Sequence, residues 1–127
     1  MSTFLYGANV HANGIRQHYL RYGPAKQAED RLSIIIIPGI TSPAVTWGFV
    51  AERFGKYFDT YVLDVRGRGL SSADDDLDYG VTAQAEDVLA FAEALGLKRY
   101  ALVGHSMGGR IGARAAAKHP AGLERLV

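Results

Sequence analysis

Residues 100–109 read YALVGHSMGG, and this stretch decides the fold that the rest of the chain implies. The apolar run at 100–103 predicts a buried strand, and the small residues that follow Ser106 predict a helix. Between them, the Gly104-x-Ser106-x-Gly108 spacing is typical of a tight strand-to-helix turn, which strains the serine backbone and requires small neighbours. The turn directs the hydroxyl toward the helix N-terminus, whose free N–H groups can stabilise a developing negative charge. We therefore predict Ser106 as a nucleophile; the alternative is a glycine-rich turn with an incidental serine.

The composition is that of one soluble globular domain, because 48% of the 127 residues are hydrophobic and 21% are charged. The net charge of +1, with both signs interspersed, argues against nucleic acid or an anionic membrane as a partner, so we expect a small molecule. The absence of cysteine excludes disulfides and thiolate metal sites. The longest apolar run, 34–37, is too short to span a bilayer, and residues 1–7 do not resemble a signal peptide. We expect a cytoplasmic protein; its oligomeric state stays open.

The first part of the chain predicts a hairpin and then a buried strand. Residues 3–10 and 15–22 have the character of strands, and Asn13-Gly14 between them is a strong hairpin turn signal. The alternation of polar and apolar residues in 15–22 predicts a partly exposed strand at a sheet edge. A polar loop is expected at 23–31. The run at 32–37, which ends in four consecutive isoleucines, predicts a strand covered on both faces, as in a parallel sheet.

The remaining chain alternates between helices and strands. Ser42 is expected to cap a helix that starts at Pro43, with an apolar stripe formed by Trp47, Val50 and Phe54. The further expected elements are a strand at 60–63, an acidic loop at 73–79, a helix from 81 that ends at Gly96, and a strand at 123–127. This alternation predicts a right-handed, mostly parallel α/β sheet in a single domain.

Three features in order resemble the α/β-hydrolase family: Pro38-Gly39, the loop Asp64-x-Arg66-Gly67-x-Gly69-x-Ser71, and the turn at Ser106. The resemblance implies an α/β-hydrolase fold, with residues 1–127 as the N-terminal half of one domain: the hairpin, the mostly parallel sheet with flanking helices, and the serine turn, or nucleophile elbow. Residues 13–23, 38–50 and 61–72 resemble a deformylase of nicotinic acid breakdown. That resemblance implies a hydrolase that releases formate from a small formyl amide, without a metal or cofactor.

The resemblance also implies a role for particular residues. The backbone N–H groups of Met107 and Ile40 are expected to form the oxyanion hole, with Thr41 as the alternative to Ile40. Arg110, one turn into the helix, is a candidate for binding a substrate carboxylate, although an internal ion pair is the preferred interpretation. For Asp64 and Arg66, a structural role in the turn is preferred to a catalytic one.

A serine hydrolase also needs a histidine and an acid, which follow the serine in this fold. After Ser106 the chain holds only His119 and Glu124. His119 comes thirteen residues later, which places it about 20 Å away along a helix with a rise of 1.5 Å per residue. His105 is expected to point away from the serine hydroxyl and to pack or line a pocket.

His11 and His18, in the hairpin, cannot be placed near Ser106 from the sequence. We therefore expect the catalytic acid and histidine beyond Val127, and the chain to be a fragment that folds poorly and is inactive by itself, with the 100–103 strand left as an exposed edge. The alternative is a non-catalytic protein, either a truncated product or a ligand-binding relative.

Overall fold

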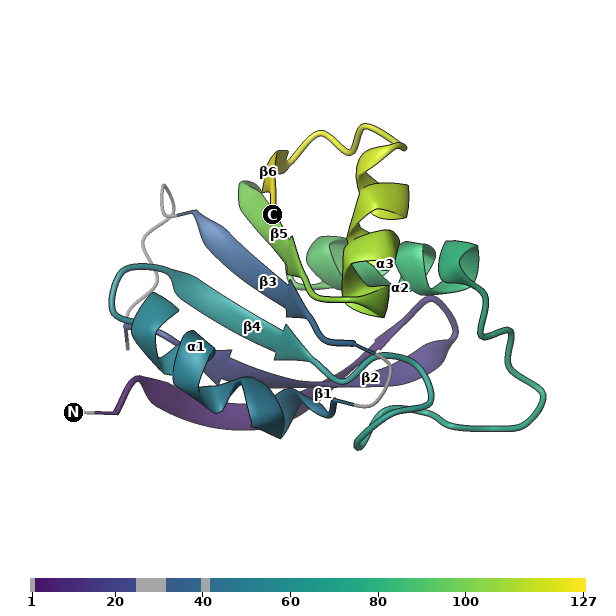
Figure 1. Ribbon diagram of the computed structural model, residues 1–127, viewed down its shortest axis with the longest axis horizontal. Helices are drawn as coiled ribbons and strands as arrows, with labels where there is room; N and C mark the ends of the chain where they lie inside the picture. The colour runs from purple at the N-terminus through teal and green to yellow at the C-terminus, as the bar shows by residue number, and fades with distance from the viewer. Residues whose placement is uncertain (1, 25–31, 40–41) are drawn as a thin grey trace.

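The computed structural model describes residues 2–24, 32–39 and 42–127. The elements in order are β1 (Phe4–Ala12), β2 (Ile15–Tyr22), β3 (Ser33–Ile37), the 3-10 helix η1 (Ala44–Trp47), α1 (Gly48–Phe54), β4 (Asp59–Leu63), α2 (Val81–Ala94), β5 (Tyr100–Gly104), α3 (Met107–Ala116) and β6 (Leu123–Leu126). The strands form one sheet in the order β1-β2-β4-β3-β5-β6, with α1 on one face and α2 and α3 on the other (Figure 1). The expected α/β architecture is confirmed.

Two apolar clusters fill the two sides of this sheet. One joins side chains of β3, β4 and β5 to α2 and α3, with Phe91 fully buried at its centre. The other joins the opposite faces of β3 and β4 to η1 and α1. All residues of β3 are buried, as the unbroken apolar run predicts. Within the described parts of the chain, every helix falls short of the length and apolarity that a bilayer crossing requires.

The N-terminal hairpin is present, but β2 is not an edge strand. Asn13 and Gly14 have φ angles of 54° and 76°, which suits the tight turn that their sequence predicts. β2 lies between β1 and β4, and β1 is the edge strand instead. The prediction was wrong because Gln17 and Arg21 are buried polar residues. Arg21 donates to the Asp59 carboxylate at 2.9 Å, so its polarity does not signal contact with water.

The helix after β3 begins differently from the prediction. Ser42 makes no capping hydrogen bond, because the chain first forms η1 after Pro43 and α1 starts only at Gly48. This 3-10 turn changes the phase of the apolar stripe. Trp47 and Phe54 pack against the apolar cluster as expected, whereas Val50 is 38% exposed and Ala51 takes the buried position.

The strand at the C-terminal end also changes the expected sheet edge. β6 pairs in parallel with β5, and the Gly104 N–H donates to the Val127 carbonyl at 2.9 Å. β5 is therefore covered on both sides, and the expectation that it forms an exposed edge was wrong. The helix α2 ends as predicted, with Gly96 in the left-handed conformation (φ 67°) directly after the cap residue Leu95.

Candidate active site

Ser106 lies at the apex of the turn between β5 and α3, with φ 56° and ψ −120°. A non-glycine residue at such a positive φ is strained, and strain of this kind is concentrated at functional sites. A Cβ atom at Gly104 would lie 2.3 Å from the carbonyl oxygen of Gly108, and one at Gly108 would lie 1.8 Å from that of Ile37. Both positions therefore require glycine, as the motif spacing predicts.

In the first turn of α3, one backbone N–H group beside this serine has no hydrogen-bond partner among the described residues. The Gly108 N–H donates to the His105 carbonyl and the Gly109 N–H to the Ser106 carbonyl, both at 2.9 Å. The Met107 N–H has no partner among the described residues. Free N–H groups at a helix N-terminus are suited to hold an anionic oxygen. Of the two expected donors, Met107 thus has the required free group.

The segment after β3 packs directly against the turn. A Cβ atom at Gly39 would lie 3.3 Å from the Ser106 Cβ and 3.3 Å from the His105 carbonyl oxygen, so the backbone approaches the serine closely here. Ile40 and its alternative Thr41 lie outside the described residues. The structure therefore places Gly39 beside the serine, and the position of the second expected donor stays a prediction.

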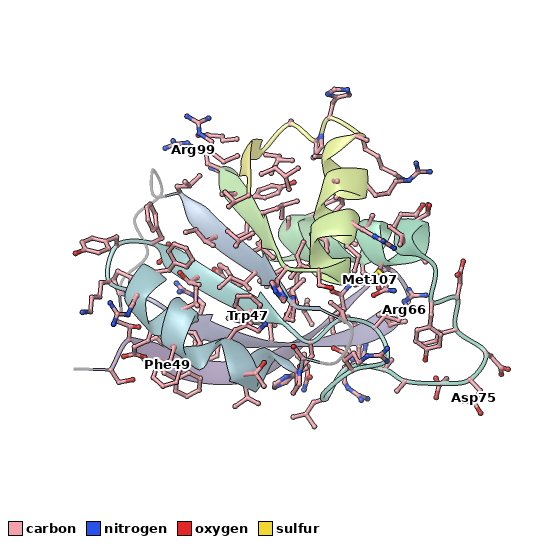
Figure 2. All side chains as sticks on the ribbon, in the orientation of Figure 1. Trp47, Phe49, Arg66, Asp75, Arg99 and Met107 are labelled. Carbon is pink, nitrogen blue, oxygen red and sulfur yellow. The ribbon has the colours of Figure 1, made fainter. Side chains whose placement is uncertain are left out.

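His105 contacts an aromatic ring and not the serine hydroxyl. Its ring meets that of Trp47 edge-on, with the ring centroids 5.3 Å apart and the planes inclined by 61°. Trp47 lies at the end of η1, on the side of the sheet that α1 covers (Figure 2). The contact joins the turn to the segment after β3, and it agrees with the expectation that His105 is a packed residue.

Arg110 is exposed in the first turns of α3, and its guanidinium makes no ion pair with any described residue. The internal ion pair that we considered is therefore not found in the described part of the chain. The Met107 side chain points toward Arg66 (Figure 2). Met107 lines a cavity of 70 Å³ with Val65, Arg66, Arg68, Tyr79 and Gln84.

The two charged residues after β4 hold the structure together. Asp64 accepts hydrogen bonds from the backbone N–H of Ala44 at 2.7 Å and from Nδ1 of His18 at 2.8 Å. Arg66 forms two hydrogen bonds with the Asp87 carboxylate, at 2.8 and 2.9 Å, and both side chains are buried. These contacts agree with the structural role preferred from the sequence.

The His18–Asp64 contact was missed from the sequence because it depends on the register of β2. β2 runs antiparallel to β4, and the Asp64 N–H donates to the His18 carbonyl at 2.9 Å, which places the two side chains next to each other. No local pattern in either strand marks this pairing. The sequence predicted only the hairpin and the strands that follow it, and not which strand pairs with β2.

The remaining titratable residues do not reach the serine. His119 lies past the far end of α3, and Glu124 binds Arg99 on the exposed side of β6 at 2.5 and 3.0 Å. The hydrogen bond from Arg99 holds the pKa of Glu124 below its usual value. Among the described residues, no side chain is hydrogen-bonded to Ser106, and no group of three or more histidines and carboxylates is placed to bind a metal ion.

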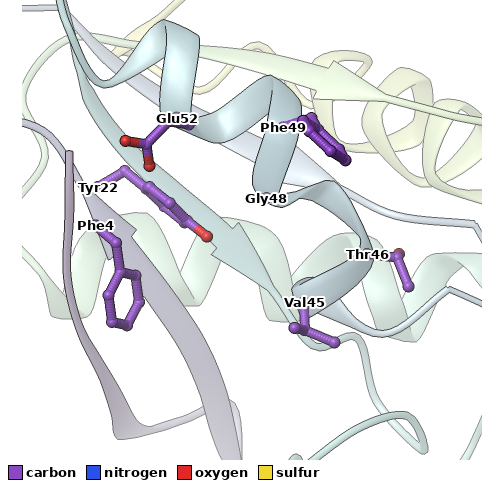
Figure 3. A pocket seen from close by; sticks show the side chains of 7 residues that line it. All are labelled: Phe4, Tyr22, Val45, Thr46, Gly48, Phe49 and Glu52. Carbon is purple, nitrogen blue, oxygen red and sulfur yellow. The ribbon is translucent and has the colours of Figure 1, made fainter. Parts of the chain in front are cut away.

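Two hollows that are lined by described residues lie away from the turn. A hollow of 500 Å³ lies between β1, β2 and the start of α1, where the Tyr22 hydroxyl approaches Gly48 (Figure 3). A second, of 440 Å³, shares Phe4, Tyr22 and Val45 with it and reaches His18 and Asp64. Neither is lined by a residue of the 104–109 turn.

Comparisons with known proteins agree with this geometry. Residues 33–127 match the family model described as the alpha/beta hydrolase fold. The whole chain is 67% identical to N-formylmaleamate deformylase from Pseudomonas putida and covers 46% of that protein. It is 31% identical over 119 residues to epoxide hydrolase 2 from Caenorhabditis elegans, which is 93% of this chain and 32% of that protein.

A solved structure gives the same result in three dimensions. The crystal structure of an N-formylmaleamic acid deformylase from Pseudomonas putida matches with a TM-score of 0.85 at 50% identity, covering 95% of this chain and 45% of that one. The chain thus spans less than half the length of each of these relatives. Because the family match includes β3, β4, β5 and the strained turn at Ser106, the chain belongs to the α/β-hydrolase fold family.

Proposed function

We propose that this chain carries the nucleophile of a serine hydrolase, and that Ser106 attacks the carbonyl of a small amide or ester. The observation that carries the proposal is the strained, exposed serine between two positions that only glycine can occupy. A structural turn has no need to hold a serine at φ 56°, because glycine adopts such angles without strain. Acyl transfer needs this arrangement, in which the hydroxyl is held clear of the sheet.

The proposed oxyanion hole uses backbone N–H groups. Met107 donates the first, because its N–H group adjoins the nucleophile and has no partner in the described parts of the chain. We assign the second to Ile40, with Thr41 as the alternative, since this segment follows Gly39 and Gly39 packs against Ser106. Loss of one such donor costs about 2.7–4 kcal/mol of transition-state stabilisation.

The base and the acid are proposed to lie in a part of the polypeptide that these 127 residues do not include. The support is that no described side chain bonds to Ser106 and that the chain covers 46% of the deformylase. Residues 1–127 are then the N-terminal part of a single domain. We expect the chain alone to release no product, because Ser106 lacks a group that removes its proton.

The proposed substrate is N-formylmaleamate, which would be hydrolysed to maleamate and formate. The support is the 67% identity to the Pseudomonas putida deformylase over the whole chain. Such a substrate carries a carboxylate. Arg110 is exposed one turn from the serine and makes no ion pair with a described residue, so we propose that its guanidinium binds this carboxylate.

The test joins this chain to the remaining part of the Pseudomonas putida deformylase and measures formate released from N-formylmaleamate. We expect turnover that Ser106→Ala abolishes, together with covalent labelling of Ser106 by a fluorophosphonate, which needs an activated serine. A folded chimera that shows neither turnover nor labelling would support the alternative, a non-catalytic or ligand-binding relative. Turnover of esters with no release of formate would retain the hydrolase and reject the proposed substrate.

A further inference from the structure

The Asp64 carboxylate joins three separate segments of the chain. Its Oδ1 accepts the Ala44 N–H at 2.7 Å, at the start of η1. Its Oδ2 faces the Leu70 N–H at 3.2 Å and His18 Nδ1 at 2.8 Å. The Asp64 side chain is only 5% exposed, and that of His18 12%. An ionised carboxylate accepts hydrogen bonds only, so the His18 ring is the donor in this pair, in the tautomer with a proton on Nδ1.

The first of these contacts holds the backbone of Ala44, which follows Gly39 by five residues. Gly39 in turn packs against Ser106. Between Gly39 and Ala44, the Ser42 N–H donates to the Gly39 carbonyl at 3.2 Å, so the backbone that leads to Ala44 is tied to Gly39. The position of Ala44 therefore influences how Gly39 packs against Ser106.

We propose that Asp64 is a positioning residue, which holds Ala44 and, through the hydrogen bond between Ser42 and Gly39, keeps Gly39 in place against Ser106. We propose that His18 orients the Asp64 carboxylate. The inference rests on the proposed function, in which the backbone N–H of Ile40, or of Thr41, binds the oxyanion. Asp64 does not touch substrate; it acts through the backbone of Ala44. A donor displaced by as little as about 1 Å lowers turnover by about a hundredfold.

The local chemistry requires a carboxylate and not an amide. Backbone N–H groups approach both oxygens, from Ala44 on one side and from Leu70 on the other. Asparagine has one oxygen, so one of these N–H groups would face an NH₂ donor. The loop leaves no room for a compensating shift, because a Cβ atom at Gly69 would lie 2.2 Å from the Asp64 carboxylate.

The test compares Asp64→Asn with Asp59→Asn in the chimera with the deformylase remainder. Asp59 is the matched control, since it is a buried carboxylate at the opposite end of β4 and is bonded to Arg21 at 2.9 Å. We expect Asp64→Asn to lower kcat by about 10- to 100-fold with KM within about twofold, because an oxyanion donor acts mainly in the transition state. Asp59→Asn should lower the Tm and leave kcat unchanged.

Substitutions at His18 provide a second measurement if Asp64→Asn does not fold. His18→Asn places an amide NH₂ near the position of Nδ1 and should retain most of the turnover, whereas His18→Phe removes the donor and should lower kcat by about 3- to 10-fold. Equal kcat in these two variants, or equal loss of kcat in Asp64→Asn and Asp59→Asn, would overturn the positioning role.

Amide exchange separates this inference from the proposed function. In a folded Asp64→Asn variant, the Ala44 amide should lose protection and the Gly39 and Ser106 amide resonances should shift, while Asp59→Asn leaves all three unchanged. These changes in exchange and resonance position would support the positioning role even if the unsubstituted chimera releases no formate. Absence of formate release would reject the proposed function and leave the positioning role standing. Unaltered exchange at Ala44 would reject the inference even in an active enzyme.

Discussion

The adjacent glycines at the start of α3 give the sharpest test of the turn. A Cβ atom at Gly108 would lie 1.8 Å from the Ile37 oxygen, 2.6 Å from the Ile37 carbonyl carbon and 2.7 Å from the Pro38 oxygen. All three atoms belong to backbone, which cannot rotate away as a side chain does. At Gly109 the nearest atom to an added Cβ is 3.7 Å away, which is ordinary contact. Gly108→Ala and Gly109→Ala thus differ only in this clash.

The magnitude follows from the movement that Gly108→Ala demands. Reaching even 3.0 Å from the Ile37 oxygen requires a shift of 1.2 Å, the difference from 1.8 Å, at the end of a buried strand. The shift also weakens the hydrogen bond from the His105 N–H to the Ile37 carbonyl, which is 3.2 Å long. Overpacking costs about 1–3 kcal/mol and the hydrogen bond about 1 kcal/mol, against about 1 kcal/mol gained in helix propensity. Because the clash is with backbone, the overpacking cost lies at the upper end of its range, and the expected net loss is about 3 kcal/mol.

Gly109→Ala keeps the gain in helix propensity without the clash, so it should stabilise the protein by about 0.5–1 kcal/mol. Thermal unfolding of the chimera measures both variants. At about 2–4 °C per kcal/mol for a protein of this size, Gly108→Ala should lower the Tm by about 6–12 °C and Gly109→Ala should raise it by about 1–4 °C. A Gly108→Ala variant within about 2 °C of the unsubstituted chimera would refute the argument from backbone contact.

Three further predictions concern charge and ionisation. Asp87→Ala leaves Arg66 buried without its carboxylate and should cost about 3–5 kcal/mol in urea unfolding, with a loss below about 1 kcal/mol contradicting the buried pair. Burial raises the pKa of Tyr100, so the folded state keeps the hydroxyl proton to a higher pH than the unfolded state does. The free energy of unfolding should therefore fall as the pH rises above about 10, and it should fall less steeply in Tyr100→Phe. Arg110→Met should raise KM for N-formylmaleamate by about tenfold, whereas Arg114→Met, one turn farther from the serine, should leave KM unchanged; equal effects would reject the carboxylate contact.

The strained turn could be predicted from the sequence because its requirements are local. Gly104 and Gly108 are each in contact with backbone only a few residues away or on the adjacent strand, so the spacing of the motif already contains the geometry. The hairpin at Asn13-Gly14 was predictable for the same reason, since two residues with positive φ suffice to define it.

The position of β2 in the sheet could not be predicted, because its polar residues are buried through distant partners. Gln17 donates to the Asp87 carbonyl at 3.1 Å, a contact across 70 residues, and Arg21 reaches Asp59 across 38. An alternating strand with buried polar residues has the same pattern as one that faces water. Only the partner, which comes from another part of the chain, distinguishes the two cases.

The start of α1 shows a different limit. The apolar spacing predicted a helix correctly, but the 3-10 turn at its start changed the phase and exposed Val50. That turn begins at Ala44, whose N–H is bound by the Asp64 carboxylate and not by the local residue Ser42. A cap supplied from twenty residues away leaves no signal near the helix that it caps.

Three of the contacts that shape the serine turn are made between described residues of this chain, so these contacts do not depend on the rest of a longer protein. Gly108 is in contact with the end of β3, Gly39 with Ser106, and Ala44 with Asp64. None of them needs a residue beyond 127. In the proposed function, the part of the polypeptide beyond these 127 residues supplies the groups for proton transfer and further contacts to substrate, and this chain orients the nucleophile. Substitutions at Gly108 and Asp64 should therefore alter the turn in any partner context, whereas those at Arg110 should matter only when substrate binds.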